Sequence, residues 1–258
     1  ELQTLAQSEL TNLITYFHKN NLVPNPTKTQ YTIFYPTTEQ ETIQLHINKT
    51  PIQQTETAKL LGIFIEQKMK YHKTITNIIK KLQGTIRDFK YANKLLPPTT
   101  MLNIYYQQAY PHLIGDITIW GTSNPAQTYI QPLIRIQKKL IRLIKNLPPR
   151  THTKPIMTEL KLLNMTNLYI QRTCIKMHPF IHHTDQRNRP EHNNNYLYTA
   201  QIHDYPTRHS LQGHHYIPNH YQYAKHSNFK HHMEHSTKEK TKIWNTLPQQ
   251  LREERSLK

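Results

Sequence analysis

The chain has 258 residues and a formal net charge of +17, with 33 lysines and arginines against 16 acidic residues. Its hydrophobic fraction of 36% predicts a thin core, and its single cysteine, Cys174, excludes a disulfide framework. No apolar stretch approaches the roughly 20 residues of a membrane span, and no signal peptide is recognisable. We therefore expect an intracellular protein, nuclear or cytoplasmic and not secreted, with no membrane partner.

Residues 1–66 combine one predicted helix with short predicted strands. Apolar residues recur at helical spacing over 1–19, and Pro24 and Pro26 end this pattern. Residues 31–35, 42–47 and 60–65 have the composition of strands, and we interpret the last as a buried strand whose backbone is closely approached at Gly62. One helix and about three strands are too few for an independent sheet domain.

Residues 67–150 read as a small helical bundle. Apolar periodicity predicts helices over 68–95, over 101–114 and from Pro125 to Leu147, and prolines separate them. The first helix carries a basic residue at every seventh position. These residues are Lys73, Lys80, Arg87 and Lys94. The third helix carries a basic stripe made of Arg135, Lys138, Lys139, Arg142 and Lys145.

The positive charge is concentrated in the middle of the chain. Residues 67–161 hold 16 basic and three acidic side chains, a net charge of +13, whereas residues 1–66 hold four and six. No acidic residue lies between Arg135 and Arg150, so the five cations of the stripe have no nearby partner in the sequence. Nucleic-acid phosphates would supply the missing counter-charge, without sequence specificity. A solvated helix face, or a generally adhesive basic surface, is the alternative.

Residues 151–258 are predicted to be partly helical and partly irregular. A fourth helix is expected over 156–177, an irregular and partly disordered segment over 178–236, and a periodic stretch over 237–255. Thirteen of the 18 histidines lie at or after His178, and His231 and His235 have helical i, i+4 spacing. Because no second cysteine is present, we favour compositional bias over a zinc site.

Several motifs, in this order and spacing, resemble the C-terminal half of reverse transcriptases from Jockey-like non-LTR retrotransposons (LINEs). The N-terminal motifs are Leu22–Thr29 and Thr57–Ile65. They are followed by Tyr71-His72-Lys73, Pro111-His112-Leu113, Trp120-Gly121, Gln137–Arg142 and Ile243–Pro248. The resemblance covers nearly the whole chain. It implies an α+β fragment with a palm remnant at 1–66, a thumb-like helical domain at 67–150 and a basic C-terminal extension at 151–258.

The resemblance also implies roles for individual residues. Lys28 would lie near the phosphates of the incoming nucleotide, where a lysine can neutralise or protonate the leaving pyrophosphate. Leu60, Leu61, Gly62 and Ile63 would form the primer grip, the hairpin that holds the 3′ end of the primer. The basic residues of 67–150 would bind the template–primer duplex, either RNA–DNA or DNA, through its phosphates.

The Tyr-Ala-Asp-Asp box of the family has no counterpart here, and the chain is expected to begin after it. The four aspartates, at positions 88, 116, 185 and 204, include no close pair, whereas polymerase chemistry needs carboxylates converging on two metal ions. We expect no catalytic residue and no metal or other cofactor in this chain. The Mg²⁺ ions would belong to the intact parent enzyme, whose N-terminal polymerase half is a potential partner. A stand-alone nucleic-acid-binding protein and a decayed reading frame are the alternatives.

Overall fold

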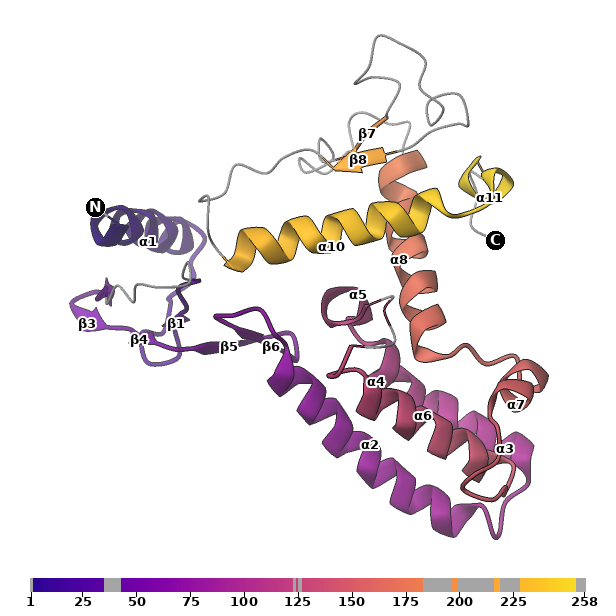
Figure 1. Cartoon of the computed structure of the whole chain (residues 1–258). Helices are drawn as coiled ribbons and strands as arrows, with labels where there is room; N and C mark the ends of the chain where they lie inside the picture. Colours follow the sequence, from indigo (N-terminus) through magenta and orange to yellow (C-terminus); the bar gives the residue numbers. More distant parts are fainter. Residues whose placement is uncertain are drawn as a thin grey trace. The chain divides into compact units, whose positions relative to one another are not determined.

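The computed structural model describes residues 2–34, 43–122, 124, 127–182, 196–198, 216–218 and 228–253. It has an α+β fold in which helices predominate over short two-stranded sheets (Figure 1). The chain forms two compact units. The first comprises residues 1–71 and 223–232, and the second comprises residues 72–222 and 233–258.

The first unit packs one helix against short strands. Its elements are α1 (Leu2–Lys19), β1 (Gln30–Tyr31), β2 (His46–Ile47), β3 (Thr50–Pro51), β4 (Gln53–Gln54), β5 (Thr57–Leu60) and β6 (Ile63–Glu66). β1 pairs with β4 in parallel, while β2 with β3 and β5 with β6 are antiparallel. The predicted set of about three antiparallel strands is thus divided into three separate pairs, one of them parallel.

The core of the first unit is small and one-sided. Ile43, Leu45, Ile47 and Ile52 are buried, and Ala6, Leu10 and Ile14 of α1 pack against them. The Gln7 side chain pins α1 to β2, because its amide nitrogen donates to the His46 carbonyl at 3.0 Å and its oxygen accepts from the His46 N–H at 2.9 Å. No residue of α1 is fully buried. This unit therefore buries little apolar surface, and the hydrophobic effect contributes little to its stability.

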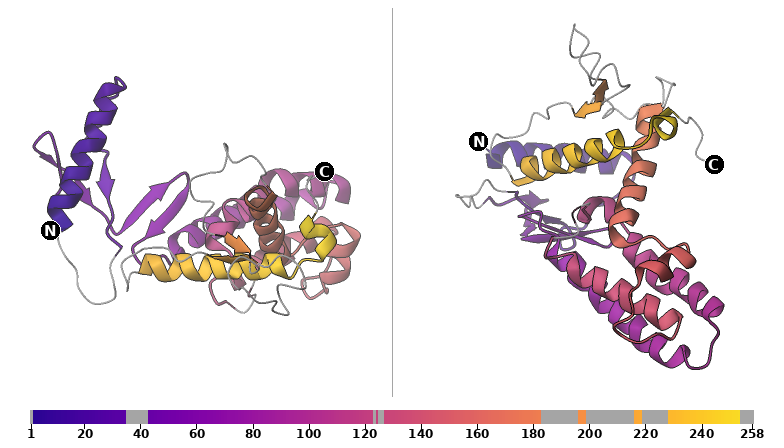
Figure 2. Two further views of the ribbon diagram at one scale, coloured as in Figure 1. Left: turned by 90° about the horizontal axis from the view of Figure 1, so that it is seen from above. Right: turned by 45° about the vertical axis from the view of Figure 1, so that its right-hand side comes forward.

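The second unit is a helical bundle (Figure 2). It contains α2 (His72–Ala92), α3 (Pro98–Ile104), the π-helical segment η1 (Tyr105–Ala109), α4 (Tyr110–Ile114), α5 (Ile117–Trp120), α6 (Gln131–Ile144), α7 (Lys154–Glu159), α8 (Met165–His182) and α11 (Gln249–Glu253). α10 (Asn228–Asn245) belongs to it from Met233 onward. β7 (Tyr196–Tyr198) and β8 (Tyr216–Pro218) form an antiparallel pair.

α2 and α6 pack against each other and form the centre of the bundle. α2 buries Ile75, Ile78, Leu82, Ile86 and Phe89 at helical spacing, and α6 buries Leu133, Leu140, Ile141 and Ile144. Beyond the C-terminal ends of the two helices, the Asn93 amide donates to the Asn146 side chain at 3.3 Å. The two helices therefore run in the same direction. The elements that join them in sequence, α3, η1 and α4, run the opposite way.

A close approach at Gly121 fixes the short helix α5 against α8. A Cβ on Gly121 would lie 2.3 Å from the Ile117 carbonyl oxygen and 2.7 Å from Cδ2 of Tyr169. The neighbouring Trp120 is 2% exposed, and its indole N–H donates to the Gly115 carbonyl at 2.8 Å. Only glycine fits position 121 without displacing backbone atoms.

Two expectations about the second half of the chain need correction. The predicted single helix over 156–177 is two helices, because α7 ends at Glu159 and Lys161 adopts a left-handed φ of 54° before α8 begins. The segment expected to be irregular, 178–236, is ordered at both ends: α8 continues to His182, and α10 begins at Asn228. Residues 196–198 and 216–218 form strands, and the remainder of the segment lies outside the described residues.

Candidate nucleic-acid interface

The basic stripe of α6 lies opposite the face that α6 buries. Arg135, Lys138 and Lys139 are exposed, while Gln137 and Leu140 between them are wholly buried. Within the described parts of the chain, none of these three cations makes a hydrogen bond or ion pair. At 1.5 Å per residue the three side chains fall within roughly 6 Å along the helix axis. They form a compact cationic surface that is available to an anion.

The other two cations of the stripe are already engaged. The Lys145 ammonium lies 2.5 Å from a carboxylate oxygen of Glu159 in α7, although no acid is near it in the sequence. Arg142 is half-buried, and its Nε donates to the Thr151 carbonyl at 2.8 Å. The expectation of five unpartnered cations is therefore wrong at Lys145, and Arg142 is partly committed to the protein. The turn after α6 brings the loop and α7 back against the end of the stripe.

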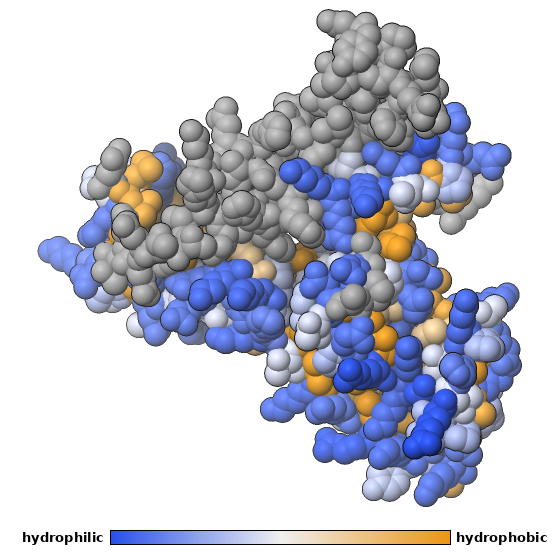
Figure 3. Space-filling model, in the orientation of Figure 1, coloured by the Kyte–Doolittle hydropathy of each residue, from blue (hydrophilic) through white to orange (hydrophobic). Residues whose placement is uncertain are grey.

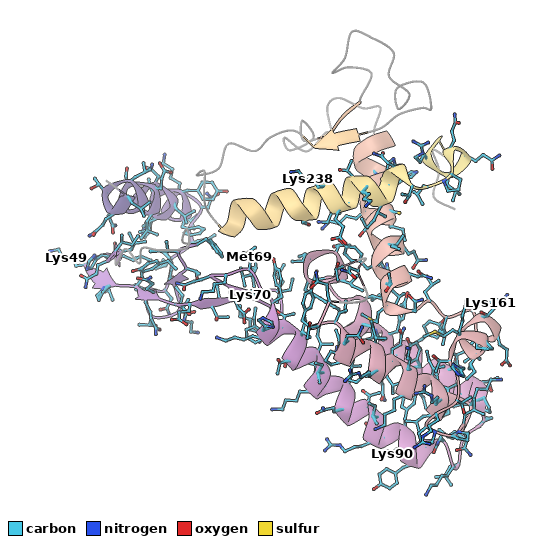
Figure 4. All side chains as sticks on the ribbon, in the orientation of Figure 1. Lys49, Met69, Lys70, Lys90, Lys161 and Lys238 are labelled. Atoms are coloured by element: carbon cyan, nitrogen blue, oxygen red, sulfur yellow. The ribbon has the colours of Figure 1, made fainter. Side chains whose placement is uncertain are left out.

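α2 presents a second basic face. Lys73, Lys80 and Arg87 are exposed on the side opposite its buried apolar residues, and Lys94 is exposed just beyond the end of the helix. Lys90, labelled in Figure 4, is a further exposed cation near that end. Figure 3 shows mainly hydrophilic side chains over the part of the surface where α2 and α6 lie, interrupted by smaller apolar patches.

The motif around Gly62 is a hairpin turn rather than the interior of a buried strand. β5 and β6 pair antiparallel, with Leu60 opposite Ile63, and Leu61 and Gly62 connect them with φ values of 48° and 93°. Two consecutive positive φ values suit the tight turn of a twisted hairpin. A Cβ on Gly62 would meet no atom within 4 Å, so the predicted close backbone approach is wrong. The tip is apolar and exposed, by 58% at Leu60 and 92% at Leu61.

Lys28 is exposed on a turn organised by Asn25. The Asn25 side-chain oxygen accepts from the Thr27 N–H at 3.0 Å and from the Thr27 hydroxyl at 2.7 Å. The Asn25 carbonyl accepts from the N–H groups of Lys28 and Thr29. These hydrogen bonds give a structural reason for an asparagine three residues before Lys28. The Asn25 side chain and carbonyl fix the turn, and the turn exposes the Lys28 side chain.

Sequence reasoning missed Gln137, which is a central polar contact of the bundle. Its side-chain nitrogen donates to the Leu163 carbonyl at 2.9 Å and lies 3.3 Å from the Tyr105 hydroxyl. Burial raises the pKa of Tyr105 to about 12, so this hydroxyl stays protonated. The detectable signal was a glutamine at a position that the apolar periodicity of α6 assigns to the core.

Sequence reasoning also missed the contact between α10 and α8. Trp244 is 1% exposed and packs on Met177, with its ring 6.3 Å from that of His178. Glu239 accepts hydrogen bonds from the hydroxyls of Tyr169 and Thr122, both at 3.1 Å. The motif Ile243–Pro248 thus anchors the C-terminal helix to the bundle.

The described residues contain no cluster of catalytic or metal-binding type. Asp88 and Asp116 are exposed on different elements, and positions 185 and 204 lie outside the described residues. No group of three histidine, cysteine or acidic residues in the described chain could hold a metal ion. Most of the C-terminal histidines fall beyond it. Of the helices described, none has the length and apolarity to cross a membrane.

One comparison connects the chain with a known protein. Over 103 residues it is 26% identical to the "Probable RNA-directed DNA polymerase from transposon X-element" of Drosophila melanogaster. The match covers 39% of this chain and 11% of that protein. No protein-family model matches the chain, and no solved structure gives a significant match. The chain is thus distantly similar, over part of its length, to a probable RNA-directed DNA polymerase from a transposon.

Proposed function

We propose that this chain is a C-terminal part of a Jockey-like non-LTR retrotransposon reverse transcriptase and that it holds a template–primer duplex. One observation carries the proposal: the exposed cations Arg135, Lys138 and Lys139 lie together on α6, opposite its core face. Unpaired cations on one face repel each other, and a phosphate backbone relieves that repulsion. The distant relationship to a transposon RNA-directed DNA polymerase supports nucleic acid as the polyanion.

In this proposal the first unit is the end of the palm and α2 to α6 form the thumb. The exposed β5–β6 hairpin would act as the primer grip, with Leu60 to Ile63 against the end of the primer. Lys28, on its asparagine-shaped turn, would lie near the nucleotide phosphates. Mg²⁺ would be bound by aspartates of the parent polymerase, so this chain would position the duplex and would perform no chemistry itself.

The test is the salt dependence of binding to an RNA–DNA duplex, measured by fluorescence anisotropy. Each phosphate contact contributes about −0.9 to the slope of log affinity against log salt. Replacing Lys138 and Lys139 together by glutamine should flatten this slope by about two and weaken different sequences equally.

The matched control is the double variant Lys19→Gln, Lys49→Gln in the first unit. Both lysines are exposed, and Lys49, which is labelled in Figure 4, lies in the turn between β2 and β3. The control removes two positive charges, as the α6 variant does. If the control flattens the slope as much as the α6 variant does, only net charge matters. The assignment of α6 as the interface is then wrong.

A further inference from the structure

Three basic side chains lie on two helices that cross, two of them on α8 and one on α10. The crossing is defined by the hydrogen bond from the Tyr169 hydroxyl to Glu239 and by the packing of Trp244 on Met177. Within it, Lys240 of α10 lies close enough to Lys176 of α8 for the two charges to interact. Arg172 precedes Lys176 by four residues on α8, and residues at this spacing share a helix face.

Lys240 is in an unfavourable environment for a cation. Burial lowers the pKa of Lys240 to about 8, and the neighbouring charge of Lys176 lowers it further in the same direction. The Glu239 carboxylate opposes this shift without cancelling it. Its two oxygens already accept hydrogen bonds from Thr122 and Tyr169. The protein thus holds a partly buried amine beside a like charge, with incomplete compensation.

Arg172 adds a second, independent cost at the same crossing. Its Nε is buried and has no hydrogen-bond partner among the residues that the structure describes. A buried N–H of a charged group without an acceptor destabilises the folded state. It has lost its hydrogen bond to water and forms none within the protein. One oxyanion between the helices would accept from the arginine and neutralise the repulsion between the two lysines.

We propose that Arg172, Lys176 and Lys240 form an oxyanion site between α8 and α10 that binds a phosphate of a nucleic-acid backbone. The inference rests on the proposed function and extends it, since it adds a phosphate contact beyond the stripe of α6. A phosphate fits the three groups because the planar arginine fork matches its oxygens and the lysines act as point charges. The site would also couple docking of α10 to binding of the duplex.

The direct readout is the ionisation of Lys240, followed by NMR of a 13C-labelled lysine side chain in the full chain. A duplex oligonucleotide should raise the pKa of Lys240 from about 8 by at least about one unit, since a bound anion favours the charged amine. Sodium chloride at the same ionic strength should change it much less, since it only screens the repulsion from Lys176. If neither the duplex nor inorganic phosphate moves this pKa, the proposed site is refuted.

Inorganic phosphate serves as the second probe and separates two sources of the ligand. A shift with the duplex supports the proposal, whether or not phosphate alone also produces one. A shift with inorganic phosphate but none with a duplex that binds the protein overturns the assignment to a nucleic-acid backbone. Because the phosphate titration needs no nucleic acid, it remains informative if duplex binding itself fails.

The variant test uses Arg172→Gln with Lys176→Gln, which retains Lys240 and both residues of the Trp244–Met177 contact. We expect the slope of log affinity against log salt concentration for duplex binding to flatten by about two, because two phosphate contacts would be lost. The Lys19→Gln, Lys49→Gln pair is again the control of equal charge. An unchanged slope in the Arg172 and Lys176 variant would contradict the proposal even if the α6 stripe binds as expected.

Discussion

The side-chain amide of Gln137 donates a hydrogen bond of 2.9 Å to the backbone carbonyl of Leu163, inside the helical bundle. The glutamine is wholly buried, and the carbonyl belongs to the segment just before α8. This bond ties the helix that presents the basic stripe to the helix that receives α10. The contact therefore links the two parts of the bundle that carry the candidate phosphate sites.

We expect Gln137→Leu to destabilise the second unit by about 1–3 kcal/mol, because the Leu163 carbonyl and the buried Tyr105 hydroxyl would both lose their hydrogen-bond donor. Urea unfolding followed by circular dichroism measures the change. Gln107→Leu, at an exposed position of η1, is the control and should alter stability by less than about 0.5 kcal/mol. Equal stability of Gln137→Leu and the wild type would show that the contact is dispensable.

Two glycines should respond to alanine in opposite directions. Gly121→Ala should cost about 1–3 kcal/mol, since its Cβ would collide with the Ile117 carbonyl and the Tyr169 ring. Gly84→Ala should stabilise by up to about 1 kcal/mol, because the site lies within α2 and its nearest obstacle is the end of the Arg87 side chain at 3.9 Å. Thermal unfolding should show a lower midpoint for Gly121→Ala and a higher one for Gly84→Ala than for the wild type. A Gly121→Ala midpoint equal to that of the wild type would disprove the close approach.

Lys240 should contribute stability that rises with pH between about 8 and 10 in phosphate-free buffer. The folded pKa of Lys240 is about 8 and its ordinary value is 10.5, so in this window the unfolded chain binds more protons and the folded state gains stability as they are lost. Two charged groups act on this amine: Lys176 across the helix crossing and Glu239, which precedes Lys240 on α10 and accepts a hydrogen bond from the Tyr169 hydroxyl.

Above pH 10 the trend should reverse. Burial raises the pKa of Tyr105 to about 12 and raises that of Tyr169 as well, so the tyrosines of the unfolded chain ionise first and favour unfolding. Urea midpoints recorded from pH 7 to 11 should therefore pass through a maximum. Lys240→Met should remove the rising limb and leave the falling one. A rising limb that persists in this variant would assign the effect to another group.

The isolated chain should not extend a primer. Its four aspartates include no close pair, and the two that the structure describes, Asp88 and Asp116, lie exposed on different elements. Without converging carboxylates, two metal ions cannot be held at the primer hydroxyl. Primer extension with Mg²⁺ or Mn²⁺ should give the same signal as buffer. Incorporation that survives replacement of each aspartate would overturn both this prediction and the proposed fragment.

Local periodicity was sufficient to predict the main helices and the direction of their charges. The apolar residues of α2 and α6 recur at helical spacing, so the opposite faces of these helices had to carry the cations. Their burial pattern agrees with this prediction. The strand prediction around Gly62 failed because a short apolar run does not distinguish a strand from a hairpin whose turn is also apolar.

What the sequence by itself determined, then, is the α+β class, the amphipathic helices and the presence of a basic face, because each follows from residues that are close in the chain. Only the tertiary structure decided which cations are free. Glu159 reaches Lys145 and the Thr151 carbonyl reaches Arg142 only because the chain reverses after α6. The same holds for Lys240, which lies beside Lys176 across a helix crossing although the two residues are 64 positions apart in the chain. Coulomb interactions and desolvation depend on distance in space, which no local pattern encodes.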